Sequence, residues 1–234
     1  MRDVVVMAAG EGIRLRPFTE RWPKPVLPID GKPVLATLLR ELSAAGCKRA
    51  FVVTGHLAEQ VETLVGDGRA FGLDVRFVRQ PSVLGSADTV LRSLAAGAAP
   101  PFLVTAADTV YTAGDVARFA AAFAASAAAG AIAVRRDPVP DRSQRQPVRV
   151  VEGRVVKLID DDQSNPLSAA PLWAFREPLV PLLADLPGPP YELADVFARA
   201  IADGLVIAAP EIGRTRDLTH PVDLVAENFP YLGR

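Results

Sequence analysis

Short strand-like and helix-like segments alternate along the first two thirds of the chain, and this alternation constrains the fold more than any other feature. The strand-like segments are β-branched or apolar runs bounded by turn residues. The helix-like segments carry apolar residues at three–four spacing. Repeated β-α units predict an α/β fold with a mostly parallel sheet and helices on both faces. We expect strands at residues 3–8, 50–54, 75–79, 102–106 and 131–134, and helices at residues 33–45, 56–65, 86–96 and 115–128.

The pattern changes after Asp137. Residues 137–147 are polar and contain several prolines, which predicts an exposed loop. Two β-like runs, 147–151 and 155–159, are joined by Glu152-Gly153-Arg154 and predict an inserted β-hairpin. Neither a linker nor an internal repeat interrupts the sequence, so we expect one domain over residues 1–234. The remaining expected elements are strands at 168–175 and 205–209 and helices at 177–183, at 192–203 and from Pro221 onward.

Composition excludes several classes of function. The chain has 26 Lys and Arg against 27 Asp and Glu, and a net charge of −1 argues against a protein that coats nucleic acid. No apolar run approaches the roughly 18–20 residues of a membrane span, and the apolar start is too short for a secretory signal. The single cysteine, Cys47, excludes an internal disulfide. We therefore expect a cytoplasmic protein in which Cys47 is a buried, unreactive thiol.

The segment after the first strand carries features of a phosphate-binding loop. Gly10 and Gly12 let the backbone approach a ligand, and the N–H groups of such a loop can face phosphate oxygens. Arg14 offers a planar fork suited to a polyphosphate, and Lys24 offers a mobile point charge. Prolines on both sides of Lys24 stiffen the backbone there. Together these residues predict a loop that binds a polyphosphate.

Two common phosphate-binding motifs do not fit this loop. A dinucleotide-binding fingerprint needs a third glycine three positions after Gly12, where the chain has Leu15. A P-loop ends in Gly-Lys-Ser or Gly-Lys-Thr, whereas Gly31-Lys32 is followed by Pro33. The loop therefore belongs to another class of nucleotide or phosphate site.

The run Ala8-Ala9-Gly10-Glu11-Gly12-Ile13-Arg14-Leu15, with Pro23-Lys24-Pro25 after it, resembles the opening signature of the sugar-1-phosphate nucleotidyltransferases. That family is related to the phosphocholine cytidylyltransferases. The resemblance implies a three-layer, Rossmann-like fold, with nucleotide bound by about residues 1–136 and acceptor by about residues 137–234. It also implies a base-reading glutamine before a Gly-Ser pair. The implied nucleotide-binding residues are Ala8, Ala9, Gly10, Gly12, Arg14, Gln80, Gly85 and Ser86, and the implied catalytic residues are Arg14, Lys24 and Asp108.

Nucleotidyl transfer needs neutralisation of negative charge, and Mg²⁺ is commonly held by one or two carboxylates together with phosphates and water. Ligands of open α/β sheets bind at the carboxyl ends of the strands. Asp108 follows an apolar strand directly and is the first candidate ligand. The resemblance implies a second metal aspartate before the last helix, where Asp217 matches better than Asp223. We therefore expect Mg²⁺ at Asp108 and Asp217.

The expected acceptor site departs from the family pattern. Many relatives have a Glu-Lys pair and an asparagine that hold the sugar, and at the matching places this chain has Asp160 to Asp162 and Ser168-Ala169-Ala170. Asp160 replaces the glutamate, whereas the lysine and the asparagine have no counterpart. Glu192 is the other candidate acceptor-binding residue that the resemblance implies.

The sequence thus predicts an enzyme that joins an NTP to a sugar 1-phosphate and releases pyrophosphate. The acceptor phosphate is largely dianionic at pH 7, because its second pKa is about 6. No side-chain nucleophile is needed, so His56 and His220 are expected to be structural. One alternative is the same chemistry on a non-sugar acceptor such as phosphocholine, and another is a nucleotide-sensing domain without turnover. The base, the acceptor and the oligomeric state stay open.

Overall fold

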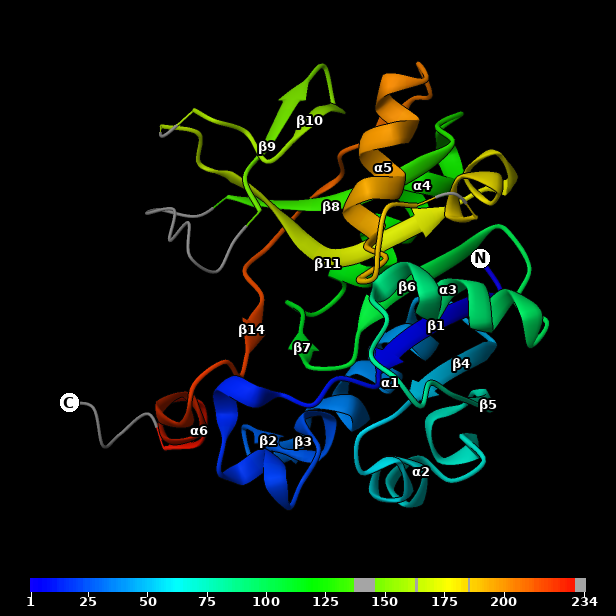
Figure 1. Ribbon diagram of the computed structural model, residues 1–234. Coiled ribbons are helices and arrows are strands. Elements are labelled where there is room, and N and C mark those ends of the chain that lie inside the picture. Colours follow the sequence, from blue (N-terminus) through cyan, green and yellow to red (C-terminus); the bar gives the residue numbers. More distant parts are fainter. Residues whose placement is uncertain (137–145, 163, 185, 230–234) are drawn as a thin grey trace.

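The computed structural model describes residues 1–136, 146–162, 164–184 and 186–229. Most of the predicted loop at 137–147 lies outside these residues. One 10-stranded sheet runs through the molecule (Figure 1). Nine of its strands follow one another across the sheet in the order β5 (Asp74–Arg79), β4 (Arg49–Thr54), β1 (Asp3–Ala8), β6 (Phe102–Ala106), β11 (Leu167–Phe175), β8 (Gly130–Arg136), β12 (Ile207–Ala208), β10 (Arg154–Leu158) and β9 (Val148–Val151), and β13 (Glu211–Ile212) also pairs with β8.

The strands that the first half of the chain contributes to the large sheet pair with one another in parallel, as the β-α alternation predicts. β1 lies between β4 and β6, and β5 extends this group beyond β4. β11 is antiparallel to both of its neighbours, β6 and β8, and so connects the parallel group to the strands of the second half. β9 and β10 form the predicted antiparallel hairpin. The sheet is therefore parallel on one side and mixed on the other.

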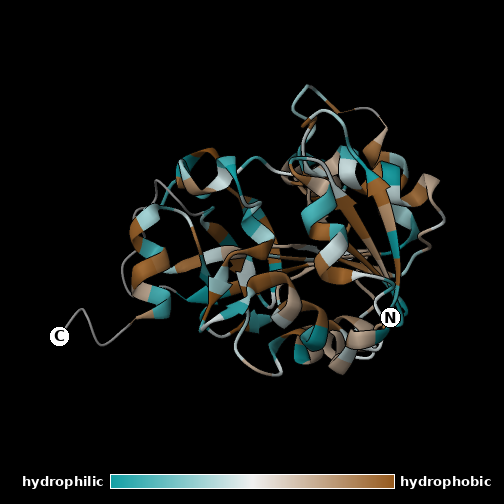
Figure 2. Cartoon of the chain, turned by 90° about the horizontal axis from the view of Figure 1, so that it is seen from below, coloured by the Kyte–Doolittle hydropathy of each residue, from teal (hydrophilic) through white to brown (hydrophobic). Residues whose placement is uncertain are grey.

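Helices cover both faces because the strand residues alternate between two apolar clusters. Val4 and Val6 of β1 belong to one cluster, and Val5 between them belongs to the other. Figure 2 shows hydrophobic residues along the strands and on the helix sides that face them. The first cluster contains residues of α1 (Val34–Ala44), α2 (Ala58–Val65) and α4 (Asp115–Ala125), and the second contains residues of α3 (Ser86–Ala95) and α5 (Leu193–Ala202).

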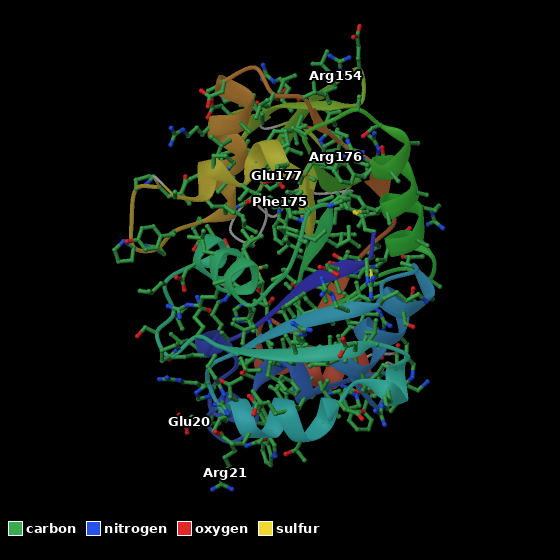
Figure 3. All side chains as sticks on the ribbon, turned by 90° about the vertical axis from the view of Figure 1, so that its right-hand side faces the viewer. Glu20, Arg21, Arg154, Phe175, Arg176 and Glu177 are labelled. Carbon is green, nitrogen blue, oxygen red and sulfur yellow. The ribbon has the colours of Figure 1, made fainter. Side chains whose placement is uncertain are left out.

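Phe175 and Arg176, labelled in Figure 3, join the two halves of the molecule at the end of β11. Phe175 stacks on Phe102 with ring centroids 5.3 Å apart and packs edge-on against Phe197. Arg176 lies over the ring of Phe123 and donates to the carbonyl oxygens of Phe123 and Ser126. These bonds satisfy carbonyl groups at the end of α4, which ends at Ala125 and not at residue 128 as expected.

Several short elements differ from the sequence-based expectation. The helix expected at 177–183 consists of two 3₁₀ turns, Glu177–Leu179 and Pro181–Leu183, because prolines interrupt the hydrogen-bond ladder. Two pairs of two-residue strands carry no periodic pattern and were not expected. α6 (Pro221–Asn228) begins at the proline that the sequence indicates. The unexpected pairs are β2 (Pro28–Ile29) with β3 (Lys32–Pro33), and β7 (Thr109–Val110) with β14 (Arg216–Asp217).

Cys47 is buried as predicted, and burial raises the pKa of its thiol to about 11. Among the described residues, no helix has both the length and the apolar character that crossing a bilayer requires.

Candidate active site

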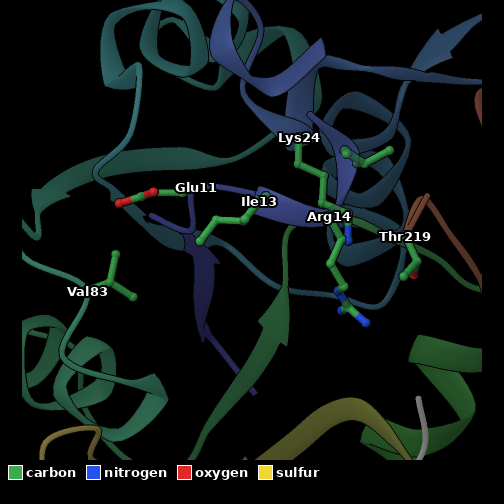
Figure 4. A pocket seen from close by; sticks show the side chains of 8 residues that line it. Glu11, Ile13, Arg14, Lys24, Val83 and Thr219 are labelled. Carbon is green, nitrogen blue, oxygen red and sulfur yellow. The ribbon is translucent and has the colours of Figure 1, made fainter. Parts of the chain in front are cut away.

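Three adjoining cavities of about 460, 340 and 350 Å³ form one cleft, and Lys24 lines all three. We call them the loop cavity, lined by Gly12, Arg14 and Val83 among others (Figure 4), the sheet cavity and the side cavity. Every residue that the sequence predicts for the site lines at least one of them, except Asp160. The sheet cavity is lined by Ala8, Ala9, Gly10, Gln80, Gly85, Ser86, Asp108 and Glu192 among others, and the side cavity by Asp108, Arg135, Gln146, Trp173, Glu192 and Asp217 among others.

Thr19 contacts the glycine loop at Gly12 and stabilises its conformation. Gly12 has a φ of +62°, and a Cβ there would lie 2.9 Å from the Thr19 methyl group. The Thr19 hydroxyl donates to the Gly12 carbonyl oxygen at 2.9 Å, and the His56 ring lies 2.6 Å from the Thr19 carbonyl oxygen. The loop conformation therefore requires glycine, and His56 has the structural role that we expected.

Lys24 and Asp108 form an ion pair in the cleft. Lys24 begins a 3₁₀ turn directly after Pro23, which fixes the backbone that carries the ammonium group. Asp108 follows β6, and the preceding residue, Ala107, donates its N–H to the Met7 carbonyl at the end of β1. The side chains of Lys24 and Asp108 are 14% and 27% exposed, so both charges face the cleft but are partly shielded from solvent.

Asp217 comes to the same place from the far end of the chain. β14 pairs with β7 so that Asp217 lies opposite Thr109, the residue after Asp108. Partial desolvation and, next, the negative charge of Asp108 raise the pKa of Asp217, while the charges of Lys24 and Arg135 act in the opposite direction. Asp223 instead accepts the N–H groups of Thr219 and His220 at the start of α6. Asp217 is therefore the better second carboxylate, as the sequence indicates.

Asp108 and Asp217 fit a magnesium site that is completed by substrate. The described residues contain no group of three or more His, Cys, Asp or Glu side chains that would hold a metal on their own. Mg²⁺ commonly takes only one or two carboxylates and obtains its other ligands from phosphates and water. Asp108 and Asp217 would supply the two carboxylates. Phosphates bound by the glycine loop and Lys24 would supply further oxygen ligands.

Gln80 lies at the back of the sheet cavity and is only 3% exposed. Its Nε2 donates to Asp88 Oδ2 at 2.7 Å, and its Oε1 accepts from the Thr89 hydroxyl at 3.1 Å. A carboxylate only accepts hydrogen bonds, so Asp88 determines which end of the amide carries the nitrogen. Arg92 holds Asp88 in turn at 2.6 Å. Asp88 and Thr89 escaped the sequence analysis, although they follow Gly85-Ser86 in the first turn of α3.

Gly85 and Ser86 have a packing role besides lining the cleft. The Ser86 hydroxyl donates to Glu192 Oε2 at 2.5 Å and accepts from the Leu193 N–H at 2.8 Å. Gly85 has a φ of +104°, and a Cβ there would lie 2.2 Å from the Tyr191 carbonyl oxygen. The pair thus joins the start of α3 to the start of α5, and Glu192 is brought into the cleft by this contact.

Asp160 does not reach the cleft, and its expected acceptor role is corrected. The residue is 3% exposed, and its carboxylate accepts from Arg149 Nη2 at 2.8 Å and from Asn165 Nδ2 at 2.7 Å. Burial alone would raise the pKa of Asp160. The hydrogen bonds from Asn165 and Arg149 outweigh this effect, so the pKa of Asp160 is lowered. Asp160 therefore holds together the base of the β9–β10 hairpin. The acidic run is visible in the sequence, whereas the hydrogen bonds from Arg149 and Asn165 to Asp160 are not.

Among the residues of the side cavity that the sequence did not indicate are Arg135, Gln146 and Trp173. Arg135 lies on β8, next to the exposed Arg136. Two consecutive arginines at the end of a strand point to opposite faces, so the alternation itself was a signal that one of them faces the interior.

Comparison with known proteins agrees with this geometry. A profile of the family described as "Nucleotidyl transferase" matches residues 3–145. The chain is 31% identical over 223 residues to the bifunctional protein GlmU of Paracidovorax citrulli. This match covers 90% of this chain and 46% of that protein. It is 42% identical over 89 residues to the glucose-1-phosphate thymidylyltransferase of Streptomyces griseus, and this match covers 38% of this chain and 25% of that protein. The chain thus spans about half the length of the bifunctional relative.

Solved structures share the fold across nearly the whole chain. A UDP-glucose pyrophosphorylase complexed with UDP-glucose superimposes with a TM-score of 0.83 at 20% identity and covers 100% of both chains. The inositol-1-phosphate CTP transferase from T. maritima gives a TM-score of 0.82 at 20% identity over 95% of this chain and 91% of that chain. The family profile, which matches residues 3–145 and thus more than half of the chain, shows that this protein belongs to the nucleotidyl transferase family.

Proposed function

We propose that this protein transfers a nucleoside monophosphate from an NTP to a sugar 1-phosphate, forming an NDP-sugar and pyrophosphate. The observation that carries the proposal is the meeting of Arg14, Lys24, Asp108 and Asp217 around one cleft in a chain of this family. In this proposal residues up to about 136 bind the nucleotide and later residues bind the acceptor. The buried thiol of Cys47 supports a cytoplasmic setting for the reaction.

The proposed chemistry needs no side-chain nucleophile. A dianionic phosphate oxygen of the acceptor attacks the α-phosphorus of the NTP and forms a new P–O bond. The bond from the α-phosphorus to the oxygen that bridges to the β-phosphorus breaks, and its electrons leave with pyrophosphate. No proton has to be removed from the attacking oxygen. The protein therefore acts by positioning the two reactants and by neutralising their charges.

Each charged residue of the cleft has a part in that neutralisation. In the proposal the N–H groups of the Gly10–Gly12 loop and the Arg14 guanidinium hold the phosphates of the leaving group. Lys24 lines all three cavities. In the proposal its ammonium group contacts phosphates of both reactants. A Mg²⁺ ion held by Asp108 and Asp217 would supply further charge neutralisation at the phosphates.

Gln80 is the candidate for reading the base. Its amide lies at the back of the sheet cavity in an orientation set by Asp88 and Thr89. A side-chain amide with a fixed orientation discriminates between base edges that present donors and those that present acceptors. The proposal leaves the identity of the base to experiment.

A second candidate function is the same reaction on phosphocholine. The observation in its favour is that Trp173 and Glu192 both line the side cavity. An aromatic face and a carboxylate are groups that recognise a quaternary ammonium ion. A nucleotide-sensing domain without turnover is the non-enzymatic alternative.

A pyrophosphate-release assay over a matrix of substrates tests these proposals. Each of the common NTPs is combined with glucose, N-acetylglucosamine and mannose 1-phosphates, inositol 1-phosphate and phosphocholine, in the presence of Mg²⁺. Release with a sugar 1-phosphate supports the first proposal, and release with phosphocholine alone supports the second. NTP binding by calorimetry without release in any combination contradicts both and supports the sensing domain.

A further inference from the structure

The side cavity has a basic residue on the wall away from the glycine loop. Arg14 and Lys24 reach the cavity from the N-terminal segment, whereas Arg135 reaches it from β8. In the sheet, β11 separates β8 from β6, the strand that leads to Asp108. Arg135 therefore contributes positive charge from the side of the sheet beyond β11, where β8 lies next to strands from the second half of the chain.

The guanidinium group of Arg135 is held by the chain that leads to Asp217. Nη1 donates to the Thr215 hydroxyl, two residues before Asp217. The same segment is fixed by the Thr112 hydroxyl, which donates to the Arg214 carbonyl at 2.9 Å. Because Arg135 and Asp217 line the same cavity, the guanidinium group lies close to the reacting end of the cleft.

The neighbouring wall contributes no positive charge. On β11 the residue opposite Arg135 is Ser168, and the following residues that line the cavity are Ala169, Ala170 and Pro171. Arg135 lies on the adjacent strand and faces the same cavity.

We propose that Arg135 binds the phosphate group of the acceptor. A guanidinium fork forms two parallel hydrogen bonds to a phosphate, which fixes the orientation of the phosphate as well as its position. Its place between Thr215 and the side cavity orients an acceptor phosphate toward Asp108, Asp217 and Lys24. The proposal rests on the transferase function and names the residue that gives this chain its affinity for a phosphate monoester.

The test compares Arg135→Gln and Arg135→Lys with Arg136→Gln under steady-state conditions, with the acceptor found in the substrate matrix. Arg136 is the matched control, because it is the next residue of β8, is largely exposed and pairs with Glu211 at 3.4 Å on the surface. Loss of a charged hydrogen-bond partner weakens binding by about 10- to 100-fold. We expect the KM for the acceptor to rise by that factor in Arg135→Gln and by less in Arg135→Lys, while the KM for the NTP changes by less than about twofold.

A second variant keeps the proposal testable if Arg135→Gln folds poorly. Thr215→Val removes the hydroxyl that holds the guanidinium group and preserves the arginine. It should raise the acceptor KM by a smaller factor and leave the KM for the NTP unchanged. An unchanged acceptor KM in Arg135→Gln, or an equal rise in both KM values, overturns the role of Arg135 but not the transferase function. Failure of the unsubstituted protein to release pyrophosphate with any pair of substrates overturns both.

Discussion

Ser86 and Glu192 are 106 residues apart in the sequence and are joined by a hydrogen bond of 2.5 Å from the serine hydroxyl to Oε2 of the glutamate. The same hydroxyl accepts the N–H of Leu193 at 2.8 Å. The Ala87 N–H donates to the Tyr191 carbonyl at 2.9 Å, so backbone and side chain take part in one contact. This contact connects the first turns of α3 and α5, one from each half of the proposed catalytic unit.

Replacing Ser86 tests that contact. In Ser86→Ala the Leu193 N–H loses its acceptor and the Glu192 carboxylate keeps only the backbone N–H of residue 86, so we expect a loss of about 1–3 kcal/mol in the free energy of unfolding. Urea denaturation followed by circular dichroism measures this loss. Ser82→Ala, in the exposed loop nearby, is the control and should change stability by less than about 0.5 kcal/mol. Equal stability of the two variants would show that the contact does not contribute.

Gly85→Ala should be more harmful than an alanine at an ordinary glycine turn. The backbone of Gly85 has a φ of +104°, and the new Cβ would lie 2.2 Å from the Tyr191 carbonyl oxygen. Strain of this kind costs about 1–3 kcal/mol before the steric clash is added. Gly204→Ala separates the two effects, because Gly204 has a φ of +81° but nothing within 4 Å of a Cβ. Thermal unfolding should show the larger decrease in Tm for Gly85→Ala, and a larger decrease for Gly204→Ala would contradict the predicted clash.

Asp108→Asn should abolish pyrophosphate release without unfolding the protein. The substitution keeps the shape of the side chain and removes one of the two carboxylates proposed for Mg²⁺, so we expect activity to fall by about 100-fold or more. Asp203→Asn, an exposed aspartate 3.9 Å from Arg199, is the control that loses the same charge away from the cleft. Activity assays and melting curves on both variants check the prediction. Normal activity in Asp108→Asn would contradict the assignment of Asp108 to the metal site.

Tyr111→Phe should destabilise the protein by removing a buried contact between β6 and β11. The Tyr111 hydroxyl donates to the Pro171 carbonyl at 2.8 Å and lies 2.8 Å from the Thr105 hydroxyl. It thereby supports β11 where its register against β8 is interrupted, between Ala169 and Trp173. Removal of the hydroxyl leaves buried polar atoms unpaired, and we expect a loss of about 1–3 kcal/mol. Chemical denaturation measures the loss, and a stability equal to that of the unsubstituted protein would contradict it.

Stability should also fall in acid because of Asp3. Burial alone raises the pKa of Asp3, but the hydrogen bonds from Arg49 and from the Ala99 N–H outweigh burial and lower this pKa below the usual 3.8. A carboxyl group whose pKa is lower in the folded state stabilises that state above the unfolded pKa, and this stabilisation is lost as the pH falls through the folded pKa. The loss therefore develops below about pH 4. Urea midpoints between pH 2 and pH 7 should depend less on pH in Asp3→Asn, and an identical dependence would contradict the prediction.

The sequence predicted those parts of the fold and the site that depend on local pattern. β1 and β6 have the expected bounds, and the spacing of Gly10, Gly12, Arg14 and Lys24 indicated one wall of the cleft. These residues are close in sequence, so their geometry follows from a short stretch of backbone.

Features that depend on contacts between distant segments could not be predicted in this way. The partners of Asp160 are Arg149 and Asn165, and no periodicity in the sequence connects the three. The approach of Asp217 to Asp108 depends on a pairing of only two residues in each strand, which is too short to leave a pattern. Family resemblance supplied Asp217, and physical reasoning from the sequence alone would have left it undecided.

The pairing of β14 with β7 also has a consequence for the order in which the proposed site is assembled. Asp217 is synthesised more than a hundred residues after Asp108, so the two carboxylates can meet only after all the residues between them have been made. The parallel strands of the first half can pair earlier, which would build the glycine loop before its catalytic counterpart arrives. A nascent chain stalled before residue 217 would therefore carry the glycine loop and Asp108 without the second of the two acids proposed for the site.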